Sequence, residues 1–157
     1  MKTLLTILFT LPMLSQVYAD FSVDPNQMLG IVDNPRTSTE IFGFDYDLEI
    51  GARDRKFSVY VFYGAFQEID YQNYGAGVDY YITLSETLEG TVGIGNGVVM
   101  RKQNDKWGGY MSPAIRSVFI VNINRNIAIT LKSQLQNRPD IGKLAIYEGS
   151  IGIRLKK

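Results

Sequence analysis

Residues 41–66 read IFGFDYDLEIGARDRKFSVYVFYGAF, and this stretch decides the fold. In its first half, apolar side chains such as Leu48 and Ile50 alternate with acidic ones such as Asp45 and Glu49. Successive side chains of a β-strand point to opposite sides of the sheet. The alternation therefore predicts a strand with one apolar face and one polar face.

The same kind of segment recurs along the rest of the chain, separated by alternately short and longer gaps. The gaps 52–55, 85–87 and 122–125 are short, whereas 67–73, 102–108 and 137–143 are longer. This rhythm is typical of an all-β, up-and-down antiparallel β-barrel of about eight strands, with tight turns at one end and longer loops at the other. The predicted strands are 41–51, 56–66, 74–84, 88–101, 109–121, 126–136 and 144–155.

Alternation alone does not say which face is inside. A membrane barrel places its apolar face outward, whereas a soluble barrel such as a lipocalin places it inward. Strand lengths near those of tilted membrane strands, and aromatic residues near the strand ends, favour the membrane. The polar faces also hold charges of both signs, which predicts an interior charge network of Asp45, Asp47, Glu49, Asp79, Glu89, Arg101, Arg116, Lys132, Glu148 and Arg154.

The N-terminus has the pattern of a secretory signal peptide over residues 1–19. Lys2 precedes a short apolar run, and Val17-Tyr18-Ala19 provides a cleavage site before Asp20. Residues 20–40 are predicted to form an N-terminal arm or a poor first strand, and residues 41–157 the barrel. Because bacterial barrels have an even number of strands, an eighth strand is needed, and Gln27–Asp33 is the candidate.

The composition excludes several kinds of chemistry. The chain has no histidine and no cysteine, and 16 basic residues balance 16 acidic ones. Imidazole-based catalysis and disulfides are therefore ruled out, and nucleic acid is not an expected partner. We predict no catalytic residues, no metal and no cofactor. The expected partner of this exported monomer is outer-membrane lipid, including lipopolysaccharide.

Three local patterns add expectations. Residues 101–107, RKQNDKW, combine basic side chains with an aromatic one, which predicts lipopolysaccharide contact through Arg101, Lys102, Lys106, Trp107 and Arg138. The carboxylates of Asp45-x-Asp47-x-Glu49 suit either a cation or basic partners inside the barrel. Glycines at alternate positions, Gly93-x-Gly95-x-Gly97, share one face and predict space for bulky interior neighbours.

The layout of the chain and its signal peptide resemble small eight-stranded bacterial outer-membrane β-barrels of the OmpA/OmpX kind. Residues 127–155, IAITLKSQLQNRPDIGKLAIYEGSIGIRL, loosely resemble the end of the lipid A deacylase barrels. Those enzymes use a late-strand histidine and serine. Here the comparable region, LKSQ at 131–134, offers Ser133 without histidine. The chain ends in two lysines after Leu155, whereas barrels of this class usually end in an aromatic residue.

Three functional hypotheses follow from these patterns. The first is a small outer-membrane barrel in the cell envelope, with a lumen filled by side chains and a structural or surface-interaction role. The second is a lipid A-modifying, deacylase-like enzyme that has degenerated. The third is a soluble periplasmic lipid-binding barrel.

Overall fold

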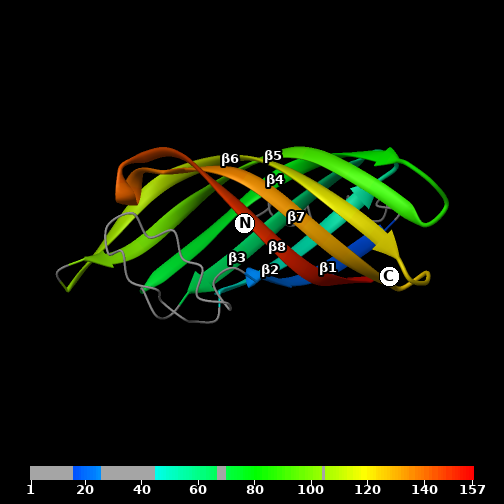
Figure 1. Ribbon diagram of the computed structural model, residues 1–157, viewed down its shortest axis with the longest axis horizontal. Helices are drawn as coiled ribbons and strands as arrows, with labels where there is room; N and C mark the ends of the chain where they lie inside the picture. Colours follow the sequence, from blue (N-terminus) through cyan, green and yellow to red (C-terminus); the bar gives the residue numbers. More distant parts are fainter. Residues whose placement is uncertain (1–15, 26–44, 67–69, 104) are drawn as a thin grey trace, which may run out of the picture.

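The computed structural model describes residues 16–25, 45–66, 70–103 and 105–157. Its strands close into one antiparallel barrel in which each strand pairs with its neighbours in chain order (Figure 1). This confirms the predicted all-β, up-and-down, eight-stranded fold. The elements are β1 (Gln16–Val23), β2 (Asp45–Asp54), β3 (Phe57–Phe66), β4 (Tyr71–Thr83), β5 (Leu88–Gln103), β6 (Lys106–Asn122), β7 (Ile127–Arg138), the short 3₁₀ helix η3 (Pro139–Ile141) and β8 (Lys143–Lys156).

The first strand of the barrel is β1, not the expected Gln27–Asp33, which lies outside the described residues. β1 pairs with β2 and also with β8, over the register Tyr18↔Lys156 to Val23↔Ile151. Its first four residues fall within the segment predicted as a signal peptide. Cleavage after Ala19 would therefore leave only Asp20–Val23 of this strand.

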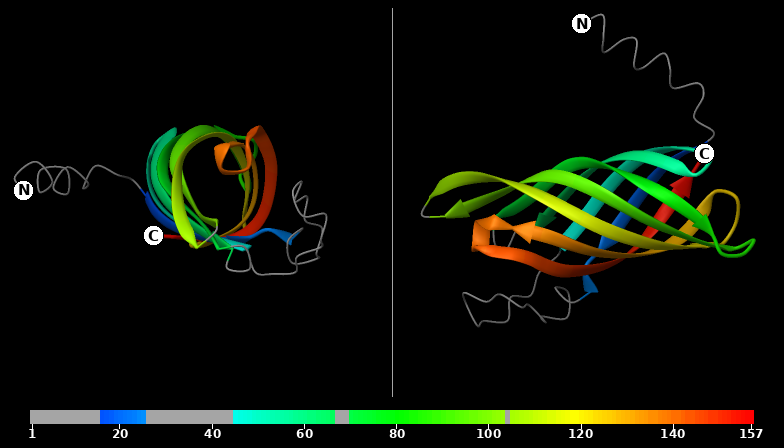
Figure 2. Two further views of the ribbon diagram at one scale, coloured as in Figure 1. Left: turned by 90° about the vertical axis from the view of Figure 1, so that its left-hand side faces the viewer. Right: turned by 90° about the horizontal axis from the view of Figure 1, so that it is seen from above.

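The two ends of the barrel differ, as Figure 2 shows. The turns β2–β3, β4–β5 and β6–β7 lie at the end where β8 finishes, which we call the turn end. The opposite end, with η3 and the tip of the β5–β6 hairpin, is the loop end. The expected longer loops are mostly strand here. β5 and β6 pair as far as Gln103↔Lys106, so the predicted loop 102–108 is wrong.

The β5–β6 hairpin projects beyond its neighbours at the loop end (Figure 2). β4 pairs with β5 only as far as Arg101, and β7 pairs with β6 only from Ala114 onward. Pro113 is the first residue of β6 past that limit. Proline has no N–H group to donate to a ladder. Pro113 is tolerated within the predicted strand because β6 has no β7 partner at this position.

The outer wall of the barrel is apolar and the lumen is polar. Leu48, Ile82 and Ile129 are 47 %, 42 % and 39 % exposed, whereas Asp79 and Arg154 are each 1 % exposed. Soluble proteins rarely expose a continuous apolar surface of this size, because its contact with water is unfavourable. The arrangement is that of a barrel surrounded by lipid. Among the described residues, no helix is long and apolar enough to cross a membrane.

Glycines make room where large side chains fill the lumen or strands approach closely. A Cβ atom at Gly77 would overlap the Tyr60 ring, and one at Gly51 would overlap the Tyr18 ring. At Gly75 a Cβ would meet the backbone of β5, at the carbonyl of Asn96. A flexible side chain can move away, but a paired strand cannot do so without losing hydrogen bonds.

Gly75→Ala is therefore expected to lower the free energy of unfolding by about 1–3 kcal/mol, the usual cost of overpacking. Gly90→Ala is the matched control, because the nearest heavy atom to its added Cβ is Leu84 Cδ1 at 3.7 Å. We expect the control to be neutral or slightly stabilising. Urea unfolding in detergent micelles measures both, and equal losses would contradict the role given to Gly75.

Candidate functional site

The residues predicted to contact lipopolysaccharide divide into two groups. Lys102, Lys106 and Trp107 lie at the tip of the β5–β6 hairpin, where Lys102 pairs across the strands with Trp107. Trp107 is 47 % exposed. Lys102 forms an ion pair of 3.3 Å with Asp105, which is open to solvent. These three residues lie on the accessible surface of the loop end.

Arg101 and Arg138 instead turn toward Asp140 of η3. Arg138 donates two hydrogen bonds to the Asp140 carboxylate, at 2.9 and 3.0 Å, and Arg101 Nη1 lies 3.5 Å from it. The Arg138 guanidinium also stacks 4.5 Å from the centre of the Tyr71 ring. We call Arg101, Arg138 and Asp140 the loop-end latch, since they tie η3 to strands β5 and β7.

Burial and the charge of Arg138 shift the pKa of Asp140 in opposite directions. Burial alone would raise the pKa of its carboxyl group, but the hydrogen bonds and charge of Arg138 hold the pKa below its ordinary value. The carboxylate therefore stays ionised at neutral pH and keeps the latch closed.

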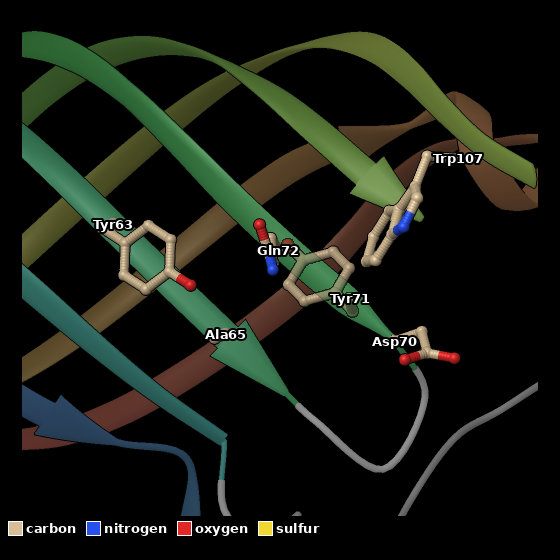
Figure 3. Close-up of a pocket in the computed structure, with 6 residues that line it drawn as sticks. All are labelled: Tyr63, Ala65, Asp70, Tyr71, Gln72 and Trp107. Atoms are coloured by element: carbon tan, nitrogen blue, oxygen red, sulfur yellow. The ribbon is translucent and has the colours of Figure 1, made fainter. Parts of the chain in front are cut away.

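A pocket of about 310 Å³ opens at the loop end, beside the latch. Figure 3 shows the side chains around it, which come from the end of β3, the start of β4 and the start of β6. The lining of the pocket includes aromatic rings, one side-chain amide and one carboxylate. The lining residues are Tyr63, Ala65, Asp70, Tyr71, Gln72 and Trp107.

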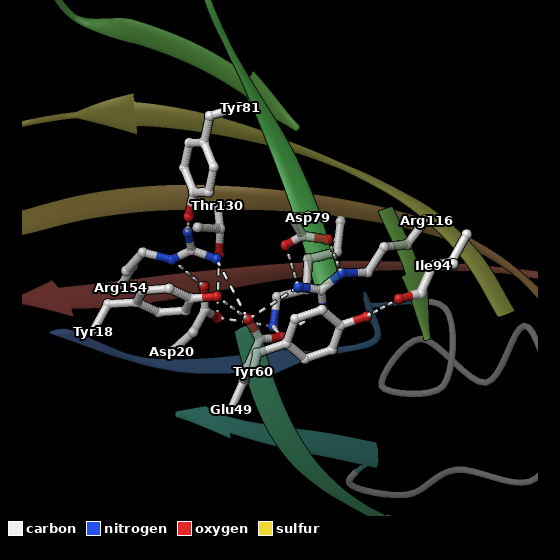
Figure 4. A network of polar contacts seen from close by, with 11 residues as sticks. Tyr18, Asp20, Glu49, Tyr60, Asp79, Tyr81, Ile94, Arg116, Thr130 and Arg154 are labelled. Carbon is white, nitrogen blue, oxygen red and sulfur yellow. Dashed lines mark hydrogen bonds and ion pairs between the residues drawn. The ribbon is translucent and has the colours of Figure 1, made fainter. Parts of the chain in front are cut away.

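A balanced group of charges fills the middle of the lumen (Figure 4). It contains three carboxylates and three basic groups contributed by six strands, and we call it the central cluster. Each carboxylate is at most 2 % exposed. Its members are Asp20 of β1, Glu49 of β2, Asp79 of β4, Arg116 of β6, Lys132 of β7 and Arg154 of β8.

Arg116 is the central clamp of this cluster. Its Nη1 donates to Glu49 Oε2 at 2.6 Å, and its Nε donates to Asp79 Oδ1 at 2.9 Å. It therefore binds one carboxylate on each side of its planar group. Charged groups inside a barrel offset their lost hydration only when they are paired and hydrogen-bonded in this way.

Lys132 and Arg154 complete the cluster around Asp20. Lys132 Nζ lies 3.0 Å from Asp20 Oδ1 and 3.4 Å from Glu49 Oε2. Arg154 Nε donates to Asp20 Oδ2 at 3.0 Å. Because Asp20 lies on β1 and Arg154 on β8, this bond crosses the seam where the barrel closes.

Tyrosine rings stack on arginine at several levels of the lumen. The guanidinium carbon of Arg116 lies 3.4 Å from the centre of the Tyr60 ring, and that of Arg154 lies 4.0 Å from Tyr18. At the turn end, Arg53 stacks on Tyr81 at 3.8 Å. These contacts combine cation–π attraction with filling of the lumen by aromatic volume.

The other predicted interior charges lie at the two ends of the lumen. At the turn end, Glu89 pairs with Arg53 at 2.8 Å. At the loop end, Glu148 pairs with Arg138 at 3.2 Å. Asp45 and Asp47 share the polar face of β2 with Glu49. In the described part of the chain, no group of three or more acidic, histidine or cysteine residues is placed to hold a metal ion.

Sequence reasoning missed some partners in these networks. Asp20, Arg53 and Asp140 were not predicted, although each pairs with a predicted residue. Asp20 and Arg53 lay in segments assigned to an arm and to a turn. A usable signal was present in the tyrosines: Tyr81 shares the polar face of its strand with Asp79, as it would if it lined the lumen.

Fold and lumen together define a small membrane-type β-barrel whose interior holds paired charges. No family model matches the chain, and no curated protein sequence matches it. Solved structures with the same fold do match, at low sequence identity.

The N-terminal β-barrel domain of Pseudomonas aeruginosa OprF aligns with a TM-score of 0.62 and 12 % identity, covering 92 % of this chain and 98 % of the other. Neisserial surface protein A aligns with a TM-score of 0.56 and 14 % identity, covering 89 % and 95 %. A de novo designed transmembrane β-barrel aligns with a TM-score of 0.58 and 13 % identity, covering 90 % and 93 %. These likenesses establish the small outer-membrane barrel fold, which does not by itself specify an activity.

Arg116→Ala is expected to lower the free energy of unfolding by about 3–5 kcal/mol, because it leaves Glu49 and Asp79 buried without their shared partner. Arg53→Ala is the matched control. It also removes a tyrosine-stacked arginine, but from a pair whose side chains are 17 % and 15 % exposed. We expect a loss of about 1 kcal/mol for it. Urea unfolding in micelles would refute the central role of Arg116 if both variants lost the same stability.

Asp140→Asn is expected to loosen η3 at neutral pH by removing the anion of the latch. Because the pKa of Asp140 is lowered in the folded state, its contribution is present above the ordinary aspartate value of about 4 and is lost as the pH falls below it. Hydrogen exchange of the Gly142 amide, which donates to the Pro139 carbonyl at 3.1 Å, should be faster in the variant at pH 7. Wild type and variant should converge once the pH has fallen below the lowered pKa of Asp140, and a difference that does not shrink as the pH falls from about 4 would contradict the latch.

Proposed function

We propose that the protein is a bacterial outer-membrane barrel that acts in the cell envelope as a structural or surface-interaction component, without transporting solutes. One observation supports this above the others: the central cluster occupies the lumen with three buried carboxylates, paired to the buried Arg116 and Arg154 and to the half-buried Lys132. An eight-stranded barrel leaves little interior space beyond its side chains. Paired charges bound to several strands at once are costly to displace.

The apolar outer wall supports placement in a lipid bilayer. The exposed residues of every strand are largely aliphatic or aromatic, including Val59 and Val61 of β3 and Ile153 of β8. Exported barrels have both termini in the periplasm and their loops outside. On this proposal the turn end faces the periplasm and the loop end faces outward, with lipid as the main partner of a monomeric barrel.

The surface role falls to the loop end. There the β5–β6 hairpin projects beyond the rest of the wall, and the latch holds η3 against the neighbouring strands. A projecting hairpin whose strands pair as far as Gln103 and Lys106 offers a pre-formed contact surface, which lowers the entropy lost on binding. The deacylase-like alternative has no comparable support: Ser133 lies on the lipid-facing side of β7 between Leu131 and Leu135, and the sequence contains no histidine.

Planar bilayer recording tests the sealed lumen. We expect the wild-type barrel, inserted from detergent, to give no steady ionic conductance, because the paired side chains of the central cluster occupy the middle of a narrow lumen. A stable open-channel current from folded wild-type protein would overturn the non-transport part of the proposal. Folding is checked by the shift in gel migration on heating.

Localisation is tested separately by fractionating cells that express the full precursor. We expect the protein in the outer-membrane fraction, with heat-modifiable migration. Recovery as a detergent-free soluble periplasmic protein would overturn the membrane assignment. A changed lipid A mass profile on expression would instead favour the enzymatic alternative.

A further inference from the structure

The pocket at the loop end is built differently from the rest of the outer wall. Tyr63 and Trp107 are both exposed, at 37 % and 47 %, and Gln72 lies between their strands in the paired sheet. Together with Ala65, Asp70 and Tyr71, these residues line the pocket, and Figure 3 shows their side chains.

The groups around this pocket offer both flat apolar faces and hydrogen-bonding atoms. The Tyr63 and Trp107 rings supply the faces, Gln72 supplies an amide donor and acceptor, and Asp70 supplies a carboxylate acceptor. A sugar ring presents the complementary pattern, with C–H groups on its faces and hydroxyl groups around its edge. Pockets that bind small polar molecules commonly combine apolar walls with a few convergent polar groups in this way.

Lys102 adds a positive charge at the edge of the pocket. Its backbone N–H donates to the carbonyl of Asp70 at 3.2 Å, and it pairs in register with Trp107. Its side chain is 36 % exposed, and its ion-pair partner Asp105 is 97 % exposed. Such a solvent-screened pair contributes little, so Lys102 can exchange it for a phosphate at small cost.

Aromatic and basic residues also lie together on the outer wall at the turn end. Phe57 and Tyr80 pack against each other there, with ring centroids 5.2 Å apart, and Lys56 lies 5.9 Å from the Tyr80 ring. Those aromatic residues close on one another, as in an ordinary interfacial girdle. At the loop end Tyr63 has an aromatic neighbour as well, since its ring centroid lies 6.4 Å from that of Tyr46, but Tyr63 and Trp107 also line the pocket.

We propose that this pocket binds the phosphorylated sugar headgroup of a membrane glycolipid. The inference rests on the proposed function, because the outward orientation places the pocket beyond the apolar wall, at the level of the lipid headgroups. Tyr63 and Trp107 hold the faces of the sugar, Gln72 and Asp70 bind its hydroxyl groups, and Lys102 binds the phosphate.

Trp107 is the single tryptophan of the chain, so its fluorescence reports directly on the pocket. The full barrel in detergent micelles is titrated with glucosamine 1-phosphate, glucosamine or inorganic phosphate. We expect a saturable change in emission with glucosamine 1-phosphate, and at least a tenfold weaker response to each part alone. An equal response to inorganic phosphate would mean simple anion binding and would overturn the proposal, as would no saturable response to any probe.

Matched variants separate the pocket from general surface effects. Tyr63→Ala and Gln72→Ala are each expected to weaken the binding of glucosamine 1-phosphate at least fivefold. Tyr80→Ala is the control, because Tyr80 is an outward tyrosine with the same 37 % exposure at the opposite end. Lys102→Ala is expected to remove the preference for the phosphorylated sugar. Equal weakening by Tyr80→Ala would overturn the proposal, and heat-modifiable migration verifies that each variant is folded.

Nanodiscs with and without lipopolysaccharide distinguish a lipid headgroup from a free sugar phosphate. We expect the Trp107 emission to shift only in the lipopolysaccharide discs, and soluble glucosamine 1-phosphate then to have no further effect. An unchanged emission would overturn the lipid source. The failure of this inference is distinguishable from that of the proposed function, because fractionation and conductance do not depend on the pocket.

Discussion

The clamp of Arg116 on Glu49 and Asp79 is the interaction on which the rest of the barrel depends. It joins β6 to β2 and β4 across the lumen. Glu49 also accepts hydrogen bonds from Lys132 and Tyr18, which adds β7 and β1 to the network. In a lipid-exposed barrel the apolar wall gains little from burial against lipid tails, which are equally apolar. The polar interior therefore has to hold distant strands together. Removing any charge would leave its partners in a medium where they cannot be rehydrated cheaply.

Volume and charge are matched inside this lumen. Tyr60, Tyr18 and Tyr81 each support a guanidinium group, and small residues stand where those rings need space, as at Gly51 and Gly77. On the polar faces, the glycines thus provide the space that the aromatic rings fill. The rings and charges of the lumen are packed together, whereas at the loop end β5 and β6 extend beyond the strands on either side of them.

Alternation of side chains was sufficient to predict seven of the eight strands and their up-and-down order. The outward placement of the apolar face was inferred from strand lengths, aromatic residues near the strand ends and the mixed charges of the polar faces. The prediction failed where the local sequence suggests one structure and the pairing with distant strands imposes another. The polar residues around Lys102 look like a loop, but they continue a hairpin because each strand still has one hydrogen-bonded partner. Asp20 was placed in an arm because β1 is short and overlaps the apolar leader. Partners such as Asp140, and the pocket beside Trp107, depend on residues far apart in the sequence, which no single segment encodes.

The junction between β1 and β8 has a kinetic consequence. The two strands pair over only six residues of each, and the Asp20–Arg154 bond that staples them joins residues 134 positions apart. Contacts of such long sequence separation form late, since the intervening chain must be ordered first. Closure of the cylinder is then the final step of assembly, after the last strand is available. Because this junction is the shortest ladder of the barrel, we expect the strands to separate there first when the protein unfolds.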